Sequence, residues 1–358
     1  MRLRSLRLGR TGPNIHPKLG YSHILAVHII ASMNDIAAIN SQELTVNLGG
    51  HPHFVDVSGA MSGKTALLVC HGGPGYSELA MIRAGAYSRL QEQAIVVMWD
   101  QRGTARSYDE TISPARMTVE QLTNDTIELT NWAREKFSSE KVHIFGHSAG
   151  GCLALLAAYQ APALYHTVFA LSPHISIGRS TAITYRELLA LAEQRQDTEA
   201  MAELRQLGPP PYRDLRHGIE LQAKWVMAFD RLVLGGPDRA TELFSRRQSI
   251  PGYTQEDYHR AQRGLEFSSR TLFDDAVSID LFDRISELKM PVTIGLGRHD
   301  LLNCSEVAAS WLEQVKAPQK RVHWFEQSAH FPHFTEPSKF QNALLATIQQ
   351  GTVDSDGG

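Results

Sequence analysis

The stretch KVHIFGHSAGG, from Lys141 to Gly151, decides how this sequence folds. An apolar, β-prone run leads into Ser148, which stands between Gly146 and Gly150 and is followed by small residues that favour a helix. Glycines at these two positions permit a sharp strand-to-helix turn that presents a serine hydroxyl. The alternative is an ordinary turn serine, which would need no partners elsewhere in the chain.

A candidate acid and a candidate base follow later in the chain. Asp300 comes shortly after the apolar run PVTIGLG, and His330 comes shortly after the run RVHWF. Because the carboxyl ends of parallel strands meet at one edge of a sheet, we expect both side chains near Ser148. A serine hydroxyl needs an imidazole to accept its proton and a carboxylate to orient that imidazole. The sequence therefore predicts Ser148 as nucleophile, His330 as base and Asp300 as acid. His333 is a rival base, and Asp300 can also cap the helix that follows it.

The segment HGGPG, His71–Gly75, follows another apolar run, ALLVC. Glycines at the exit of a strand leave backbone N–H groups open to a substrate oxygen. The amides of Gly73 and Ala149 are the predicted donors to an oxyanion, and each such donor contributes about 3 kcal/mol to transition-state stabilisation. We expect His71 to brace this loop rather than to take part in the chemistry. The alternative is a plain Gly-Pro turn.

The wider pattern predicts an α/β fold. Several continuous apolar runs indicate strands buried on both faces of a parallel sheet, and residues 119–132 between two of them show helical periodicity. Residues 44–48 and 53–59 instead alternate in polarity around a Gly-Gly pair, which predicts an antiparallel hairpin. We therefore expect a mostly parallel central sheet with helices on both faces.

The predicted domain organisation follows from where the apolar runs stop and resume. Residues 175–286 lack such runs and are amphipathic and rich in charge, which predicts a helical cap inserted into the domain. Residues 41–174 and 287–350 then form the α/β core. We interpret residues 1–40 as an N-terminal extension of uncertain status and residues 351–358 as a flexible tail.

The start of the chain allows two interpretations. The first ten residues, MRLRSLRLGR, hold four arginines and no acid, and an apolar stretch follows them. This pattern suits a targeting segment, but histidines interrupt the apolar stretch and no small-residue cleavage site follows. The favoured alternative is an upstream extension, with Met33 as the natural start of the folded part.

Composition excludes several classes of function. The 358 residues are 42% hydrophobic and 20% charged, with a formal net charge of -3, so neither a nucleic acid nor an anionic membrane is an expected partner. The three cysteines form no spaced pair, which favours a reducing, cytoplasmic location. His51 and His53 could share a face, but no acidic or Cys/His cluster accompanies them, so we expect no metal site there.

Five motifs together resemble the α/β-hydrolase superfamily, and most closely its proline iminopeptidase branch of serine aminopeptidases. They are HGGPG, WDQRG (Trp99–Gly103), GHSAGG, GRHD and SAHFPH. The resemblance implies an α/β-hydrolase fold with a cap over the site, a substrate with a free amino end and no cofactor. It also implies that Ser148, Asp300 and His330 form the catalytic triad. Asp100, Gln101 and Arg102 are expected to hold neighbouring loops.

The sequence departs from that branch at the nucleophile. The branch usually shows Gly-Gly-Ser-Trp-Gly, whereas the Gly-His-Ser-Ala-Gly found here is commoner among esterases and lactonases. The branch also binds the substrate ammonium through acids of the cap, and Asp230 is the candidate here, with Glu203, Glu220 and Glu266 as others. The leading hypothesis is a serine hydrolase that cleaves a small amide or short peptide with a free amino end through an acyl-enzyme. The alternatives are an esterase or lactonase of the same fold and, from a second class, a binding module without hydrolytic activity.

Overall fold

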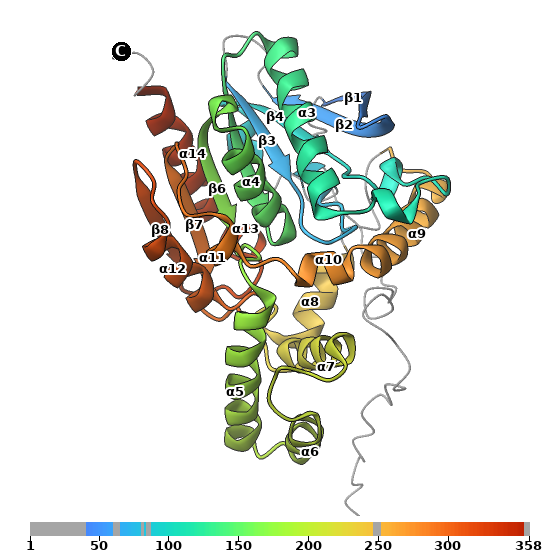
Figure 1. Ribbon diagram of the computed structural model, residues 1–358, viewed down its shortest axis with the longest axis vertical. Coiled ribbons are helices and arrows are strands. Elements are labelled where there is room, and N and C mark those ends of the chain that lie inside the picture. Colours follow the sequence, from blue (N-terminus) through green and yellow to red (C-terminus); the bar gives the residue numbers. More distant parts are fainter. Residues whose placement is uncertain (1–40, 60–64, 80–81, 84–86, 246–251, 354–358) are drawn as a thin grey trace, which may run out of the picture.

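A computed structural model describes residues 41–59, 65–79, 82–83, 87–245 and 252–353 (Figure 1). The predicted extension over residues 1–40 lies outside the described residues, and so do residues 354–358 of the predicted tail. The last described helix runs to Val353, past the predicted start of that tail at residue 351.

An eight-stranded sheet forms the centre of the molecule, in the order β1-β2-β4-β3-β5-β6-β7-β8. Strands β3 to β8 pair in parallel, whereas β1 and β2 are antiparallel to their neighbours. The predicted mostly parallel sheet is therefore confirmed. The strands are β1 Ser41–Leu48, β2 His51–Gly59, β3 Ala66–Cys70, β4 Ile95–Trp99, β5 Val142–His147, β6 Tyr165–Leu171, β7 Val292–Gly297 and β8 Lys320–Phe325.

The hairpin predicted at the start of the domain is present. Gly49 and Gly50 connect β1 to β2 with φ angles of +55° and +72°, a left-handed conformation that glycine adopts without strain. The turn packs closely on the core, because a Cβ atom at Gly49 would lie 2.5 Å from a carboxylate oxygen of Asp125. Arg102 donates to the carbonyl of Leu48 at 2.9 Å and to both oxygens of Asp125, and so fixes the hairpin to the helix α3, Val119–Phe137.

Helices cover both faces of the sheet, as predicted. Successive residues of a strand point to opposite faces, so that Leu68 belongs to one apolar cluster and Leu67 to another on the opposite face. The helices of the core are α2 Ser88–Gln91, α3 Val119–Phe137, α4 Ala149–Gln160, α12 Ser305–Gln314, α13 Pro332–Thr335 and α14 Pro337–Val353. Three 3₁₀ turns, η2 Ala105–Ser107, η3 Pro114–Arg116 and η4 Pro162–Leu164, complete it.

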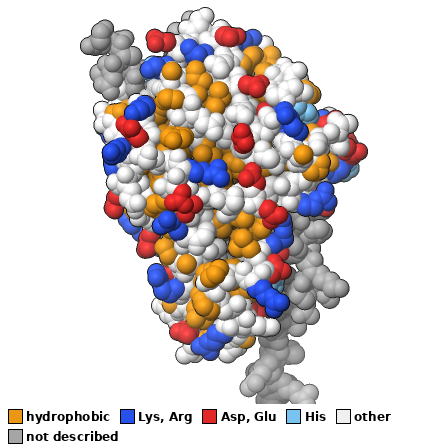
Figure 2. Space-filling view, viewed as in Figure 1, with side chains coloured by type: hydrophobic (Ala, Val, Ile, Leu, Met, Phe, Trp, Pro, Cys, Tyr) orange, Lys and Arg blue, Asp and Glu red, His pale blue; other side chains and the backbone are white. Residues whose placement is uncertain are grey.

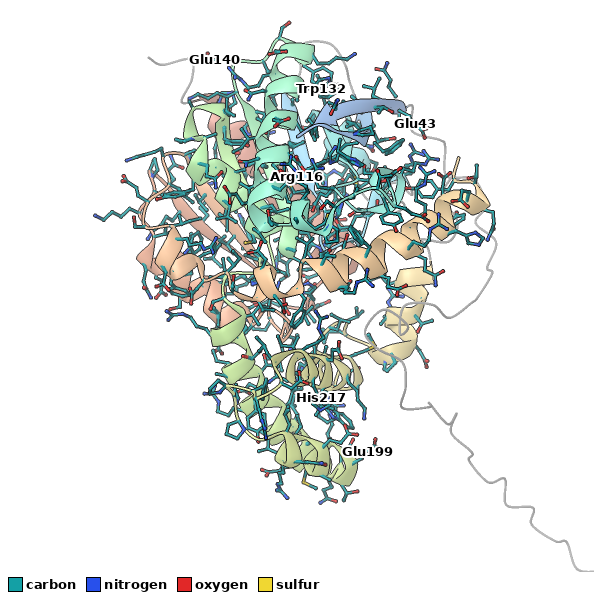
Figure 3. The ribbon with its side chains drawn as sticks, turned by 45° about the vertical axis from the view of Figure 1, so that its right-hand side comes forward. Glu43, Arg116, Trp132, Glu140, Glu199 and His217 are labelled. Carbon is teal, nitrogen blue, oxygen red and sulfur yellow. The ribbon has the colours of Figure 1, made fainter. Side chains whose placement is uncertain are left out.

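The chain between β6 and β7 is helical in the part that the structure describes. Its helices are α5 Ile177–Arg195, α6 Thr198–Leu207, α7 Leu215–Ala228, α8 Gly236–Ser245, α9 Gln255–Thr271, α10 Phe273–Val277 and α11 Leu281–Arg284. Helices α5 to α8 extend beyond one end of the sheet (Figure 1) and enclose a small core of their own around Leu188 and Trp225. In Figure 3, Glu199 of α6 and His217 of α7 lie at the opposite end of the molecule from Glu140.

Helix α9 of this block packs on the α/β core. The hydroxyl of Ser268 donates to the carbonyl of Gly103 at 2.9 Å, and Gly264 lies close enough that a Cβ atom would reach within 2.7 Å of the same carbonyl oxygen. The block is therefore attached to the core on two sides, through α9 and through the segments at β6 and β7.

The surface shows charges of both signs. In Figure 2, Lys and Arg side chains are interspersed with Asp and Glu side chains, and hydrophobic side chains lie between them. None of the helices in the described residues is long and apolar enough to span a membrane.

Candidate active site

Ser148 occupies a strained turn between β5 and α4. Its φ and ψ angles are +54° and -120°, a conformation that few non-glycine residues adopt and that costs about 1–3 kcal/mol. The turn can form because both flanking residues are glycines. A Cβ atom at Gly146 would overlap the carbonyl of Gly150, and one at Gly150 would overlap the carbonyl of Cys70. Ser148 is 8% exposed.

The structure brings the predicted base and acid to this serine. Nε2 of His330 lies 3.0 Å from Oγ of Ser148, and Nδ1 of His330 lies 2.8 Å from Oδ2 of Asp300. The carboxylate can only accept, so Nδ1 carries the ring proton and Nε2 presents a lone pair to the serine hydroxyl. This is the tautomer that a general base requires.

Asp300 combines this contact with the capping role that the sequence also allows. Its other oxygen, Oδ1, accepts hydrogen bonds from the backbone amides of Leu302 at 2.8 Å and Asn303 at 3.2 Å. Both oxygens are thus fixed, and the carboxylate holds the imidazole of His330 in one orientation.

The rival base His333 does not reach the serine. It lies on α13, is fully buried, and its Nε2 atom lies 3.7 Å from Oε2 of Glu78. Burial lowers the pKa of His333 well below its ordinary value, and neighbouring His147 lowers it further. His333 is therefore a neutral side chain beneath the site.

Gly73 and Ala149 carry the backbone amides that the sequence predicts to bind an oxyanion. Gly73 is exposed with a φ angle of +139°, and Ala149 is the first residue of α4. Within the described residues neither amide donates a hydrogen bond. The preceding residue, Gly72, lies against the nucleophile, since a Cβ atom there would come within 3.4 Å of Cβ of Ser148.

The DQRG segment supports the loops around the site. Nδ1 of His71 lies 2.6 Å from the carbonyl of Gly72, and its Nε2 accepts from the amide of Gln101 at 3.0 Å. The Gln101 side chain donates to the carbonyl of His71 at 2.9 Å. Asp100 accepts from the amide of Arg106 at 3.1 Å and so holds η2. His71 therefore braces its loop, as the sequence predicted.

Two parts of the site were missed from the sequence. Asn303 donates through Nδ2 to Oγ of Ser148 at 3.3 Å and to the carbonyl of Ser172 at 2.8 Å. A buried pair, His147 with Glu78, lies behind the serine, with 2.6 Å between Nδ1 and Oε1. His147 is the variable residue of the G-x-S-x-G motif, whereas no sequence pattern marks Glu78 or Asn303.

Glu78, His147 and His333 form a group whose donor atoms lie within 4.8 Å of one another, and such residues can bind a metal ion. Both ring nitrogens of His147 are already hydrogen-bonded, however, to Glu78 and to the carbonyl of His330. The group therefore forms a hydrogen-bonded network, in which His147 has no free lone pair for a metal.

The cysteines of the chain offer no alternative nucleophile. Cys70, Cys152 and Cys304 are free thiols, and all three are buried. Burial raises the pKa of Cys70 and Cys152 to about 12 and that of Cys304 to about 11. The thiols are therefore protonated at neutral pH, and a protonated thiol is a poor nucleophile.

The segment around Asp230 connects the helical block to the site. The amide of His330 donates to the carbonyl of Leu232 at 3.0 Å, and the amide of Leu301 donates to the carbonyl of Arg231 at 3.3 Å. Asp230 itself is 32% exposed and pairs with Arg195 at 3.2 Å. It therefore lies on a segment that binds the backbone of Leu301, beside the acid, and of His330, the base.

The other candidate acids of the block are placed differently. Glu203 is bound by Lys224 at 2.8 Å and by the indole N–H of Trp225 at 2.9 Å. Glu220 is half-buried on α7, and Glu266 is exposed on α9. Among these acids, Asp230 alone lies on the segment that contacts the residues beside Ser148.

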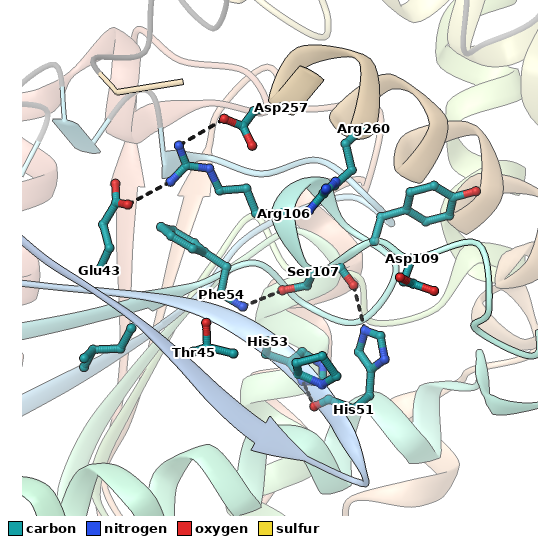
Figure 4. A pocket seen from close by; sticks show the side chains of 13 residues that line it. Glu43, Thr45, His51, His53, Phe54, Arg106, Ser107, Asp109, Asp257 and Arg260 are labelled. Carbon is teal, nitrogen blue, oxygen red and sulfur yellow. Dashed lines mark hydrogen bonds and ion pairs between the residues drawn. The ribbon is translucent and has the colours of Figure 1, made fainter. Parts of the chain in front are cut away.

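A separate hollow of about 510 Å³ lies between the β1–β2 hairpin, η2 and α9 (Figure 4). Its charged groups compensate one another, because Arg106 pairs with Glu43 at 3.1 Å and with Asp257 at 3.2 Å. Ser148, Asp300 and His330 are not among the residues that line it. The lining residues include Glu43, His51, His53, Phe54, Arg106, Tyr108, Asp109, Asp257 and Arg260. The hollow is thus distinct from the candidate active site.

Comparisons with known proteins agree with this geometry. Residues 62–338 match the family described as serine aminopeptidase, S33. The probable aminopeptidase YbaC of Bacillus subtilis (strain 168) is 30% identical over 302 residues, which cover 84% of this chain and 93% of that protein. The proline iminopeptidase of Heyndrickxia coagulans is 25% identical over 298 residues, or 80% of this chain and 94% of that protein.

A solved structure shows the same fold. The proline iminopeptidase-related protein from Thermus thermophilus superimposes with a TM-score of 0.63 at 21% identity, over 87% of this chain and 98% of that one. The fold is that of the α/β-hydrolases, as the motifs implied. The family match spans strands β3 to β8, the nucleophile turn and the segments that hold Asp300 and His330. This chain therefore belongs to the S33 serine aminopeptidase family of α/β-hydrolases.

Proposed function

We propose that this protein is a serine aminopeptidase that removes an N-terminal residue from small amides or short peptides through an acyl-enzyme. The observation that carries the proposal is the hydrogen-bonded chain from Oγ of Ser148 through His330 to Asp300, with links of 3.0 Å and 2.8 Å. Both distances lie within the range that proton transfer requires.

The proposed chemistry has two steps. Oγ of Ser148 attacks the scissile carbonyl carbon while its proton passes to Nε2 of His330. The amides of Gly73 and Ala149 bind the oxyanion of the tetrahedral intermediate. As the C–N bond breaks, the imidazolium returns the proton to the leaving amine, and Asp300 stabilises the imidazolium throughout. A water molecule, deprotonated by the same imidazole, then hydrolyses the ester to Ser148.

The relatives and the helical block support a small substrate with a free amino end. Ser148 is 8% exposed, and α5 contacts the acid segment through Thr184, whose hydroxyl donates to the carbonyl of Leu301 at 2.7 Å. A folded protein chain could not enter such a site. An ammonium group bound there needs a carboxylate partner, because leaving it unpaired costs several kcal/mol. Asp230 is the proposed partner, and the ammonium would replace Arg195.

The test compares prolyl and alanyl nitroanilides with their N-acetylated forms. An aminopeptidase should lose most of its kcat/KM on acetylation. The Ser148→Ala enzyme should be inactive but folded, because it keeps every backbone contact of the turn, and a fluorophosphonate should label only Ser148 in the unaltered enzyme. Full activity of Ser148→Ala would reject the assignment of the nucleophile.

An esterase or lactonase is the second candidate. The observation that favours it is that Asp230 and Glu203 are already bound by Arg195 and Lys224, so neither carboxylate is unpaired before substrate binds. The motif Gly-His-Ser-Ala-Gly, which is commoner among esterases and lactonases, also favours this candidate. Turnover of p-nitrophenyl esters or lactones, with equal rates on free and acetylated nitroanilides, would select this alternative and leave the nucleophile assignment intact.

A further inference from the structure

The residue before the nucleophile has hydrogen-bond acceptors at both of its ring nitrogens. Nδ1 of His147 lies 2.6 Å from Oε1 of Glu78, and Nε2 of His147 lies 2.9 Å from the backbone carbonyl of His330. A carbonyl oxygen and a carboxylate oxygen can only accept. Two acceptors require two N–H donors, so this contact pattern is that of a doubly protonated imidazolium.

The carboxylate of Glu78 supplies the compensating charge. It is fully buried, and Oε1 also accepts the backbone amide of Gly72 at 3.3 Å. Burial alone would raise the pKa of Glu78, but the charge and the hydrogen bond of His147 outweigh burial and lower the pKa to about 2. The contacts therefore pair a Glu78 carboxylate with an imidazole that donates through both ring nitrogens.

Three parts of the site meet at this pair. Glu78 binds Gly72 in the loop that carries the predicted oxyanion donor Gly73. His147 precedes Ser148 in the chain and binds the backbone of the base, His330, through its other nitrogen. We propose that the Glu78–His147 ion pair is a positioning element that fixes the oxyanion loop, the nucleophile turn and the base segment relative to one another. The inference rests on the proposed roles of Ser148 and His330.

Three other titratable groups around the pair, His333, Tyr87 and His71, are neutral. Burial lowers the pKa of His333 well below its ordinary value and raises the pKa of Tyr87 well above its own. His71 accepts a backbone N–H at Nε2, so it carries a single ring proton. Asp300 binds the far side of His330. The ring of His147 lies close to that of the base, His330, with 4.9 Å between the two centroids.

Glu78→Gln is the decisive variant because it keeps the shape but cannot keep all three bonds. Without the anion, His147 retains one ring proton, which the carbonyl of His330 requires. Nδ1 then needs a donor, so the glutamine must present its NH₂ group there. An NH₂ group cannot accept from the amide of Gly72, so one of the three links is lost in every arrangement.

The expected effect falls on kcat rather than on KM. A displacement of about 1 Å at reacting groups lowers the rate by about 10²-fold, so Glu78→Gln should lower kcat by up to that factor with little change in KM. Glu78→Gln removes the anion and the cation together, but the cation faces His330 and the anion lies on the far ring nitrogen of His147. The loss of the nearer, positive charge should favour protonation of His330, so the acid limb of the pH profile should move to higher pH. His147→Gln should act in the same direction. If the pair works as a unit, the double variant should be no slower than the slower single variant.

Asp125→Asn is the matched control. Asp125 is also a fully buried carboxylate in an ion pair, with Arg102 at 2.8 Å, but it holds the β1–β2 hairpin and touches none of the residues beside Ser148. This variant should lose thermal stability while keeping the kcat and the pH profile. If Asp125→Asn lost as much stability and as much kcat as Glu78→Gln, the positioning role of the Glu78–His147 pair would be overturned.

Two measurements separate this inference from the proposed function. In ¹⁵N-histidine NMR spectra at pH 7, His147 should show two protonated ring nitrogens, and Glu78→Gln should show one; a neutral His147 in the unaltered protein would overturn the inference whatever the substrate. The pH dependence of fluorophosphonate labelling supplies the second measurement. If Ser148 of the unaltered protein is not labelled, the proposed function fails. If it is labelled and Glu78→Gln reacts at the same rate with the same pH profile, the positioning role fails.

Discussion

The backbone amide of His330 donates a hydrogen bond of 3.0 Å to the carbonyl of Leu232, which lies between α7 and α8. This bond joins the segment of the proposed base to the helical block inserted between β6 and β7. The side chains of both segments also pack together, because Phe331 belongs to the same apolar cluster as Leu232 and Trp225. The segment of the proposed base is therefore in direct contact with the helical block.

Asp300→Asn should lower kcat by about 10⁴-fold, by analogy with the serine proteases. The amide could donate to Nδ1 of His330, which would then keep its proton on Nε2 and offer no lone pair to Ser148. Oδ1 of the asparagine could still accept from the amides of Leu302 and Asn303, so the fold should persist. Kinetics on the best substrate, with circular dichroism as the control for folding, test this. A loss of less than tenfold would show that another group orients the imidazole.

The strands of the sheet and the three residues of the proposed triad could be predicted from the sequence. The strands were predictable because continuous apolar runs of five to seven residues such as ALLVC are buried on both faces of a parallel sheet. Ser148 and Asp300 follow buried strands, and His330 follows the more exposed strand β8. All three were predictable because parallel strands end at one edge of the sheet. The position of each residue just after a predicted strand was enough to predict that the three side chains meet.

Other contacts were not predictable because they join segments whose distance apart depends on side-chain packing. Glu78 lies in a short segment after the HGGPG loop and meets His147 across 69 positions of the sequence. Asn303 reaches Ser148 only because the turn after Asp300 directs it back over the sheet. Asp230 was chosen by resemblance, and its pairing with Arg195 could not be foreseen from sequence spacing.

Gly146→Ala should prevent folding or destabilise the protein by about 3 kcal/mol, because the backbone around this position cannot move to make room for a methyl group. The new methyl group would overlap the carbonyl of Gly150 in the nucleophile turn. Gly178→Ala on α5 is the control, because no atom lies within 4 Å of its added methyl group. It should leave the stability unchanged or slightly raised. Urea unfolding of both variants measures the difference, and equal stabilities would contradict the tight turn.

Acidification below pH 6.5 should destabilise the fold through its buried neutral histidines. Burial lowers the pKa of His143 to about 3 and that of His174 to about 4, whereas an unfolded histidine has a pKa near 6.5. The unfolded chain therefore binds these protons first. Above pH 6.5 these histidines do not lower the free energy of unfolding. Below pH 6.5 the free energy of unfolding falls by about 1.4 kcal/mol per pH unit for each histidine, until the pH reaches the pKa of that histidine in the folded protein.

The measurement for this pH effect is urea unfolding between pH 7 and pH 4. A His143→Gln/His174→Gln variant should show a shallower loss of unfolding free energy over that interval than the unaltered protein. Glu78 should contribute little in this range, because its pKa in the folded protein is lowered to about 2. Its stabilisation is lost only as the pH falls below the pKa of a glutamate in the unfolded chain. Parallel curves for the two proteins would show that these histidines do not cause the loss.

The last prediction concerns Arg195, which occupies the carboxylate proposed to bind the substrate ammonium. Arg195 is 40% exposed and Asp230 is 32% exposed, so their pairing at 3.2 Å contributes little to stability, about 0–1 kcal/mol. Arg195→Met should therefore fold normally. If the ammonium must displace the guanidinium, this variant should show a lower KM for alanyl or prolyl nitroanilide, while Asp230→Asn should show a higher one. Neither variant should change the KM for the N-acetylated substrates, which carry no ammonium. A lower KM for both free and acetylated substrates would mean that Arg195 only obstructs entry, and no effect of Asp230→Asn on either would remove Asp230 from the site and return the choice of acid to Glu220 or Glu266.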